Sequence, residues 1–212
     1  MRGIVMIVDD HPLVGEAFQL SIGLAYPHLE VGRVTSATAA EAYARANAAR
    51  IKLVMLDLML PDAKGFSALL RLQQLLPNTP IAIVSARADA HTIAMARTFG
   101  VAAYLSKSQP VSSLVNSVGD ILRGEAPFAE PSETETAQPG ISGKMATLSA
   151  AQLRILVAMA DGRLNKQIGA ELNITEGTVK QHVSAIFRKL GVNNRSQALL
   201  AVRPFLSNTN LN

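Results

Sequence analysis

Apolar, β-branched runs alternate with longer helical stretches through residues 1–123, and this alternation restricts the fold more than any other feature. Strands that are apolar throughout must be covered on both faces. Their separation by helices of about 10–15 residues predicts a parallel sheet between two helical layers. We predict strands at Ile4–Val8, Leu29–Val34, Leu53–Leu56, Ile81–Val84 and Val101–Leu105, the second being the weakest. We predict helices at Pro12–Ala25, Thr38–Arg50, Gly65–Leu76, Asp89–Phe99 and Pro110–Arg123.

A stretch rich in Pro, Gly and Glu follows at 124–144 and reads GEAPFAEPSETETAQPGISGK. It has too little apolar content to offset the entropy lost on ordering, so it predicts a flexible linker. The chain is therefore predicted to hold one domain at 3–123 and a second, smaller domain at 145–207.

The second domain is predicted to be all helical. Ser149 with Gln152 forms a capping-box pattern, and Asn173–Ile174 is predicted to be a tight turn because Asn tolerates a left-handed backbone. We predict helices at Ser149–Ala160, Asn165–Leu172, Thr175–Leu190 and Ser196–Arg203, the last ended by Pro204.

Charge and composition exclude several classes of protein. Residues 144–212 hold nine Lys and Arg against three Asp and Glu, whereas residues 1–143 hold eleven against thirteen, so a polyanionic partner is expected at one end only. The absence of cysteine excludes disulfides, thiolate zinc sites and thiol catalysis. No apolar run approaches the roughly 18 residues that span a bilayer, and the N-terminus does not read as a signal peptide, so a cytoplasmic protein without a membrane partner is expected.

Charged and polar side chains follow four of the predicted strands. Asp9 and Asp10 follow the first, Asp57 the third and Ser85 the fourth, and Lys107 comes two residues after the last. Ligands of an open parallel sheet bind at the carboxyl ends of its strands, so these groups should converge. Three neighbouring carboxylates need a cation, and hard oxygen ligands suit Mg²⁺. A metal, a lysine and a hydroxyl can together hold the oxygens of a phosphoryl group, with Asp57 as its central nucleophile.

Each of these residues has an ordinary explanation when taken singly. An Asp after a strand is more often a turn or helix-cap residue, and a single lysine is most often solvated. His11 is interpreted as a loop or packing residue rather than a ligand. The arrangement at four strand ends, in this order, favours a functional site.

The motifs VDDHPLV, MLDLMLPDAKG, IVSA and YLSK resemble those of response-regulator receiver domains, which have a flavodoxin-like (βα)₅ fold. This resemblance implies that Asp57 is the phosphoacceptor, that Ser85 and Lys107 contact the phosphoryl group, and that Tyr104 is a switching aromatic residue. The Mg²⁺ ligands that it implies are Asp9, Asp10, Asp57 and the backbone carbonyl of Met59.

The predicted helix Thr175–Leu190 has an apolar stripe and an opposite polar face. The stripe repeats at helical spacing and comprises Val179, Val183, Ile186 and Leu190. The polar face carries Lys180, Gln181, Ser184 and Arg188, and a helix of this size fits the major groove of DNA. By itself the pattern also fits an ordinary amphipathic helix with a solvated face.

The motifs NKQIGAEL, TEGTVKQHV, RKLGV and NRSQA resemble LuxR-type helix-turn-helix domains. The DNA-facing residues that this resemblance implies are Thr178, Lys180, Gln181, Ser184 and Arg188. Gly169 stands where alanine is commoner in that family and is expected to loosen the short helix slightly.

The whole chain resembles the NarL/FixJ class of response regulators. The class implies a DNA-binding transcription regulator, not an enzyme, that takes phosphate from a sensor histidine kinase and forms a homodimer when phosphorylated. Two alternatives remain. A phosphohydrolase with an aspartyl-phosphate intermediate needs a second acid two residues after the nucleophile, where this chain has Met59. A DNA-binding protein with a vestigial receiver would lack the intact acidic set.

Overall fold

The computed structural model describes residues 2–63, 66–86, 88–125, 128–129 and 141–206. Its first domain is built on a five-stranded parallel sheet in the order β2-β1-β3-β4-β5. The strands are β1 Gly3–Val8, β2 Leu29–Val34, β3 Ile51–Leu56, β4 Ile81–Ser85 and β5 Ala103–Ser106. The predicted α/β class and parallel sheet are confirmed.

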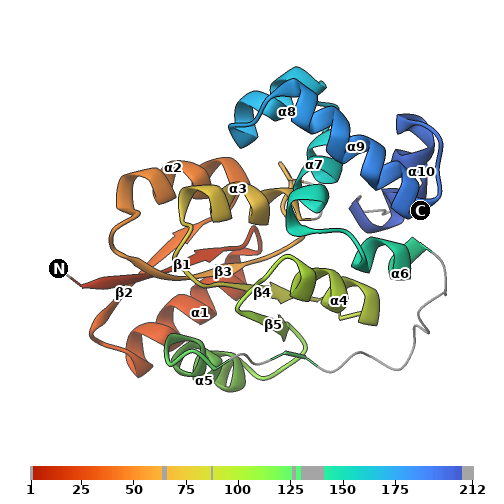
Figure 1. The fold of residues 1–212 in the computed structure, drawn as a ribbon. Coiled ribbons are helices and arrows are strands. Elements are labelled where there is room, and N and C mark those ends of the chain that lie inside the picture. Colours follow the sequence, from red (N-terminus) through yellow and green to blue (C-terminus); the bar gives the residue numbers. More distant parts are fainter. Residues whose placement is uncertain (1, 64–65, 87, 126–127, 130–140, 207–212) are drawn as a thin grey trace.

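Five helices of the first domain cover the sheet in two layers (Figure 1). One face carries α1 (Pro12–Ala25) and α5 (Val111–Leu122), whose buried side chains pack with those of the central strands. The other face carries α2 (Ala37–Asn47), α3 (Ser67–Leu75) and α4 (Ala90–Thr98). Strands that are apolar on both sides are therefore buried on both sides, as the sequence pattern requires.

The second domain holds helices α7 (Ala150–Ala160), α8 (Asn165–Leu172), α9 (Glu176–Leu190) and α10 (Arg195–Leu206). The capping box of Ser149 and Gln152 is present, and Asn173 adopts the predicted left-handed backbone with φ of 55°. The helix predicted to end at Arg203 instead continues through Pro204 to Leu206, so that prediction is wrong. Proline removes only one backbone hydrogen bond, and close to a helix end few further bonds depend on it.

Helix α6 (Ile141–Ala146) begins inside the predicted linker at 124–144, of which residues 126–127 and 130–140 lie outside the described residues. Its Met145 side chain is fully buried, and the Lys144 ammonium donates to the carbonyl of Leu190 at 3.0 Å, at the C-terminal end of α9. A cation is favourable at that end of a helix. The contacts that hold α6 are therefore with residues far along the chain.

Residues 128–129 also make defined contacts, along the outer edge of β5. The Ala129 amide donates to the carbonyl of Tyr104 at 2.6 Å, and Phe128 forms a parallel β-bridge with Tyr104. The guanidinium carbon of Arg97, on α4, lies 4.0 Å from the centre of the Phe128 ring. This segment thus covers part of the edge strand and touches α4.

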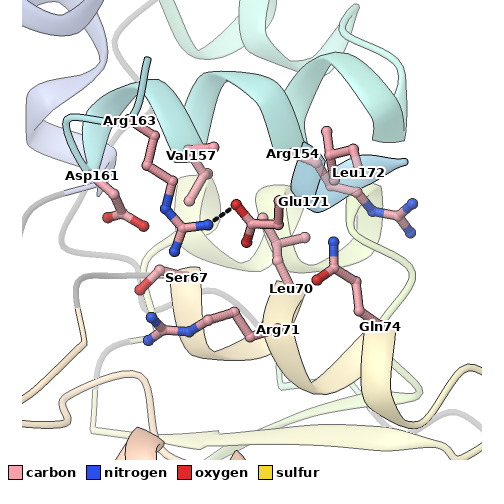
Figure 2. Close-up of a pocket in the computed structure, with 11 residues that line it drawn as sticks. Ser67, Leu70, Arg71, Gln74, Arg154, Val157, Asp161, Arg163, Glu171 and Leu172 are labelled. Carbon is pink, nitrogen blue, oxygen red and sulfur yellow. Dashed lines mark ion pairs between the residues drawn. The ribbon is translucent and has the colours of Figure 1, made fainter. Parts of the chain in front are cut away.

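The two domains meet where α3 faces α7 and α4 faces α6. Leu70 of α3 and Val157 of α7 are both buried, and the buried side chains of the second domain join the hydrophobic cluster of the α3 and α4 side. Figure 2 shows polar groups around this contact, with Arg71 on α3 and an ion pair between Arg163 and Glu171 in the second domain.

Gly169 makes room for the turn between α8 and α9. A Cβ atom built on it would lie 2.8 Å from the carbonyl oxygen of Ile174, closer than a backbone atom can be approached without movement. The residue therefore does more than reduce helix propensity, because it allows the two helices of the motif to pack closely.

We expect Gly169→Val to lower the free energy of unfolding of the second domain by ~1–3 kcal/mol, the usual cost of overpacking. Gly177→Val is the matched control, because its Cβ would meet nothing nearer than the Thr175 hydroxyl at 3.6 Å. Urea denaturation followed by circular dichroism measures both variants. Equal losses would show that the close approach to Ile174 does not matter.

Candidate functional site

Four side chains that follow β1 and β3 gather at the carboxyl edge of the sheet. Asp9, Asp10, His11 and Asp57 each offer a ligand atom, and these atoms all lie within 4.8 Å of one another. Asp9 and Asp57 are buried, whereas Asp10 is partly exposed. The parallel sheet thus brings together the carboxylates that the sequence places at its strand ends.

Lys107 supplies the positive charge in this cluster. Its ammonium lies 2.6 Å from Oδ2 of Asp57 and 2.7 Å from Oδ2 of Asp9. Burial by itself lowers the pKa of Lys107, but hydrogen bonds to Asp57 and Asp9, together with their charges, outweigh it and raise the pKa above its usual range. The lysine therefore stays protonated at neutral pH and compensates the two buried carboxylates.

Ser85 and Tyr104 lie on the two strands beside this cluster. Ser85 ends β4 and is fully buried, and its carbonyl accepts a hydrogen bond from the Lys107 amide at 2.8 Å. Tyr104 is fully buried in β5 within the cluster that also includes side chains of α4. The backbone of β4 therefore fixes the position from which Lys107 reaches the carboxylates.

His11 occupies a loop position, at the residue before α1, as the sequence predicts. Its ring, however, faces the acidic cluster rather than the core. Nδ1 lies 3.2 Å from Asp9 Oδ1, 3.0 Å from Asp10 Oδ1 and 3.9 Å from Asp57 Oδ2. The imidazole is thus a neighbour of the site that the sequence did not place there.

The donor set fits a hard divalent cation. Three carboxylates provide oxygen atoms at one point, which is the ligand type preferred by Mg²⁺ and Ca²⁺. Oδ1 of Asp10 is buried and accepts no hydrogen bond from any residue that the structure describes; its contact with His11 lacks hydrogen-bond geometry. Buried polar atoms are otherwise hydrogen-bonded, so a buried carboxylate oxygen without a donor fits a metal ligand.

Asp62, which the sequence analysis missed, anchors the loop that follows Asp57. Its carboxylate accepts hydrogen bonds from the Ala37 amide at 2.8 Å, the Thr38 amide at 2.9 Å and the Thr38 hydroxyl at 2.7 Å. These amides begin α2, where a negative charge is favourable. Burial alone raises the pKa of Asp62, but the hydrogen bonds from Thr38 and Ala37 outweigh it and lower the pKa.

The pKa of Asp62 is lower in the folded state than in the unfolded state. Its contribution to the free energy of unfolding is therefore complete above the unfolded pKa of about 3.9 and is lost as the pH falls through the pKa of the folded state. Asp62→Ala should therefore lower the free energy of unfolding by ~1 kcal/mol at pH 7, as for loss of a helix cap. The difference from wild type should narrow as pH is lowered from 5 to 3. Denaturant titrations across this range test it, and a constant difference would contradict the assignment.

The outer face of α9 is open to solvent. Val179, Ile186 and Leu190 are buried and Val183 is partly buried, which confirms the predicted inner stripe. The polar face begins at Thr178, which is half-buried. Its four exposed residues are Lys180, Gln181, Ser184 and Arg188.

Local contacts organise the N-terminal half of this face. Thr175 caps α9 and its hydroxyl lies 2.9 Å from that of Thr178. The Lys180 ammonium lies 2.8 Å from Glu176, and this hydrogen bond and charge lower the pKa of Glu176. Lys166, exposed in the first turn of α8, adds a cation that the sequence analysis overlooked although it lies within a quoted motif.

Comparison with known proteins matches both halves of the chain. Residues 5–119 match the family model of the response regulator receiver domain, and residues 146–202 match that of the bacterial regulatory proteins of the luxR family. The glycerol metabolism activator of Pseudomonas putida is 34% identical over 208 residues, covering 93% of each chain.

Two solved structures of response regulators are similar to this one. A LuxR family DNA-binding response regulator from Silicibacter pomeroyi is 26% identical, with a TM-score of 0.53 over 60% of this chain and 97% of that chain. RcsB from Salmonella enterica serovar Typhimurium, bound to promoter rprA in the presence of a phosphomimetic, shares the fold at 19% identity, with a TM-score of 0.56 over 96% of this chain and 99% of that chain.

The fold and the acidic site define a receiver domain, and the four-helix unit after it is a helix-turn-helix domain. The chain belongs to the family of response regulators that join a receiver domain to a LuxR-type DNA-binding domain. It is thus a phosphorylation-controlled transcription regulator. No helix in the described part of the chain is both long enough and apolar enough to cross a membrane.

Proposed function

We propose that Asp57 accepts a phosphoryl group from a sensor histidine kinase and that this controls DNA binding by α9. The observation that carries the proposal is the ion pairing of Lys107 with both Asp57 and Asp9 at the carboxyl ends of the strands. A buried carboxylate with an ammonium and further carboxylates around it can receive an incoming phosphoryl group. As a DNA-binding regulator, the protein is expected to act in the cytoplasm.

The residues proposed to hold Mg²⁺ are Asp9, Asp10, Asp57 and the backbone carbonyl of Met59. When bound, the ion supplies positive charge that offsets the carboxylates and the transferred phosphoryl oxygens. The Met59 amide donates to Oδ1 of Asp57 at 3.0 Å, while Oδ2 accepts from Lys107. These two hydrogen bonds orient the Asp57 carboxylate, the proposed nucleophile. Ser85 and Lys107 are proposed to contact the phosphoryl oxygens once the group is on Asp57.

Phosphorylation is proposed to act through the helices that meet the second domain. Transfer to Asp57 places new negative charge beside Lys107. Helix α3 follows the loop that begins at Asp57, and α4 follows β4, which ends at Ser85. These two helices contact α7 and α6. Tyr104 is proposed to be the switching residue, and residues 128–129, bound to its backbone, are placed to respond to a change in β5.

Incubation with acetyl phosphate and Mg²⁺ should add one base-labile phosphate, which intact-mass spectrometry measures. The Asp57→Asn variant should take up none, because an amide cannot form the acyl phosphate. Removal of Mg²⁺ should also abolish uptake, since the carboxylates would then repel the donor.

Phosphate remaining on Asp57→Asn would refute the assignment of the acceptor. We propose a regulator and not an enzyme. Sustained turnover of a generic phosphate ester would instead favour the phosphohydrolase, although that class of enzyme needs a second acid at the position where this chain has Met59.

The face of α9 is proposed to divide into a base-reading part and a backbone-contacting part. Gln181, in its N-terminal half, can form paired hydrogen bonds with adenine, as Lys180 can donate to guanine. Arg188 lies two turns further on, where a helix leaves the groove and meets phosphates. Thr178 and Ser184 border the reading part and are proposed to make further contacts.

Gln181→Ala should weaken binding to the operator by ~1–3 kcal/mol and relax the preference at one base position. Arg188→Ala should weaken binding to operator and scrambled duplexes alike and reduce the salt slope by about one. Both side chains are exposed, so both variants should fold. Titration of each variant with operator and scrambled duplexes at two salt concentrations tests both expectations. An equal loss of affinity on both duplexes for Gln181→Ala would show that Gln181 contacts the DNA backbone and not a base.

A further inference from the structure

His11 is the member of the acidic cluster for which the proposed function gives no role. Its Nδ1 atom lies 3.0 Å from Oδ1 of Asp10, without hydrogen-bond geometry, and 3.2 Å from Oδ1 of Asp9. Donor atoms that bind one ion at about 2.1 Å, in tetrahedral or octahedral geometry, lie roughly 3.0–3.4 Å from their neighbours. The nitrogen and the two oxygens therefore have the spacing of ligands to a single metal ion.

The backbone holds His11 in this position. Its amide donates to Oδ1 of Asp9 at 2.9 Å, and its carbonyl accepts a hydrogen bond from the amide of Gly15 at 3.1 Å. Pro12 restricts the residue before it to extended backbone, and His11 has φ of −82° and ψ of 107°. The imidazole does not cap α1, a helix that the structure describes in full, so a helix cap does not explain why it faces the carboxylates.

The charge of the cluster is not balanced by Lys107 alone. The Lys107 ammonium pairs with both Asp57 and Asp9, so one positive charge faces a cluster of three carboxylates. Buried charges are paired or coordinate a metal, and a divalent cation would offset what remains. A neutral imidazole adds a lone pair to such a site without adding charge. The His11 side chain is 59% exposed, so water can accept a hydrogen bond from its second ring nitrogen.

We infer that His11 gives the receiver a mixed nitrogen and oxygen metal site, and that this residue selects Zn²⁺ and similar transition-metal ions over Mg²⁺. Carboxylate and carbonyl oxygens suit Mg²⁺, whereas imidazole suits Zn²⁺ and its first-row neighbours. The inference rests on the proposed function, because it assigns His11 to the same ion. The competing role for His11 is a hydrogen bond from Nδ1 to Oδ1 of Asp9, which would position that carboxylate without any contact with the ion.

Isothermal titration calorimetry of the full chain with Zn²⁺, and separately with Mg²⁺, measures the selectivity. His11→Ala should weaken Zn²⁺ binding at least about tenfold, since even the loss of an outer-shell partner usually costs that much in metal affinity. The same variant should change the affinity for Mg²⁺ by less than about threefold, because Mg²⁺ keeps several waters and one more can take the place of the imidazole. His28→Ala is the matched control, because His28 is also exposed but lies just before β2, at the opposite edge of the sheet.

His11→Asn separates metal binding from positioning of Asp9. An Asn side chain can still donate a hydrogen bond to Asp9, but it offers no imidazole nitrogen to the ion. Zn²⁺ binding by His11→Asn should therefore fall as it does in His11→Ala. Wild-type affinity for Zn²⁺ in His11→Asn would show that the hydrogen bond alone matters and would overturn the inference.

Electron spin-echo spectroscopy of bound Mn²⁺ tests the contact directly. Wild type and His28→Ala should show nitrogen modulation, and His11→Ala should show none. Phosphate uptake with Mg²⁺ by a wild type whose Mn²⁺ spectrum lacks nitrogen modulation would refute the inference alone, as would equal losses of Zn²⁺ and Mg²⁺ affinity in His11→Ala. A wild type that binds none of the three ions and takes up no phosphate would refute the proposed function, and this inference with it.

Discussion

The pairing of one ammonium with two buried carboxylates constrains the rest of this structure. Asp9 and Asp57 are held out of water at the ends of adjacent strands, where two negative charges would otherwise oppose folding. Lys107 can reach both only because β4 and β5 are in register, with the Lys107 amide bound to the carbonyl of Ser85. Any group that draws Lys107 away from Asp9 therefore changes the balance of charge at three strand ends at once.

The acidic site is connected to the second domain through two helices of the receiver. The loop after β3 leads into α3 and the loop after β4 leads into α4, and these helices are the ones that contact α7 and α6. The contact is apolar at Leu70 and Val157 and polar around Arg71 and Arg163 (Figure 2). A displacement of either helix can be transmitted where the side chains pack, because close-packed side chains have low compressibility and transmit strain.

The sequence predicted those parts that depend on local pattern. Four strands were evident because both of their faces are apolar, whereas β2 was weak because it lies at the sheet edge and is only partly buried. The strand-end carboxylates followed from parallel topology alone. The role of Asp62 could not be predicted because its partner Thr38 lies in the first turn of α2, far from Asp62 along the chain. Helix α6 could not be predicted because Lys144 and Met145 are held by residues of the second domain. The end of α10 was predicted wrongly at Pro204, because helix propensity disfavours proline at every position in the helix interior.

The arrangement of the domains bears on how control is exerted. Gln181, Ser184 and Arg188 are exposed although the second domain packs against α3 and α4, so the receiver does not cover the reading face of α9. A contact that leaves this face open cannot regulate DNA binding by blocking access to a single helix. What it can restrict is the geometry with which two second domains are presented to two half-sites, since half-site spacing demands a fixed separation of the paired helices. Under the proposed function, control therefore acts through the relative placement of two second domains, because the receiver does not cover the reading face of α9.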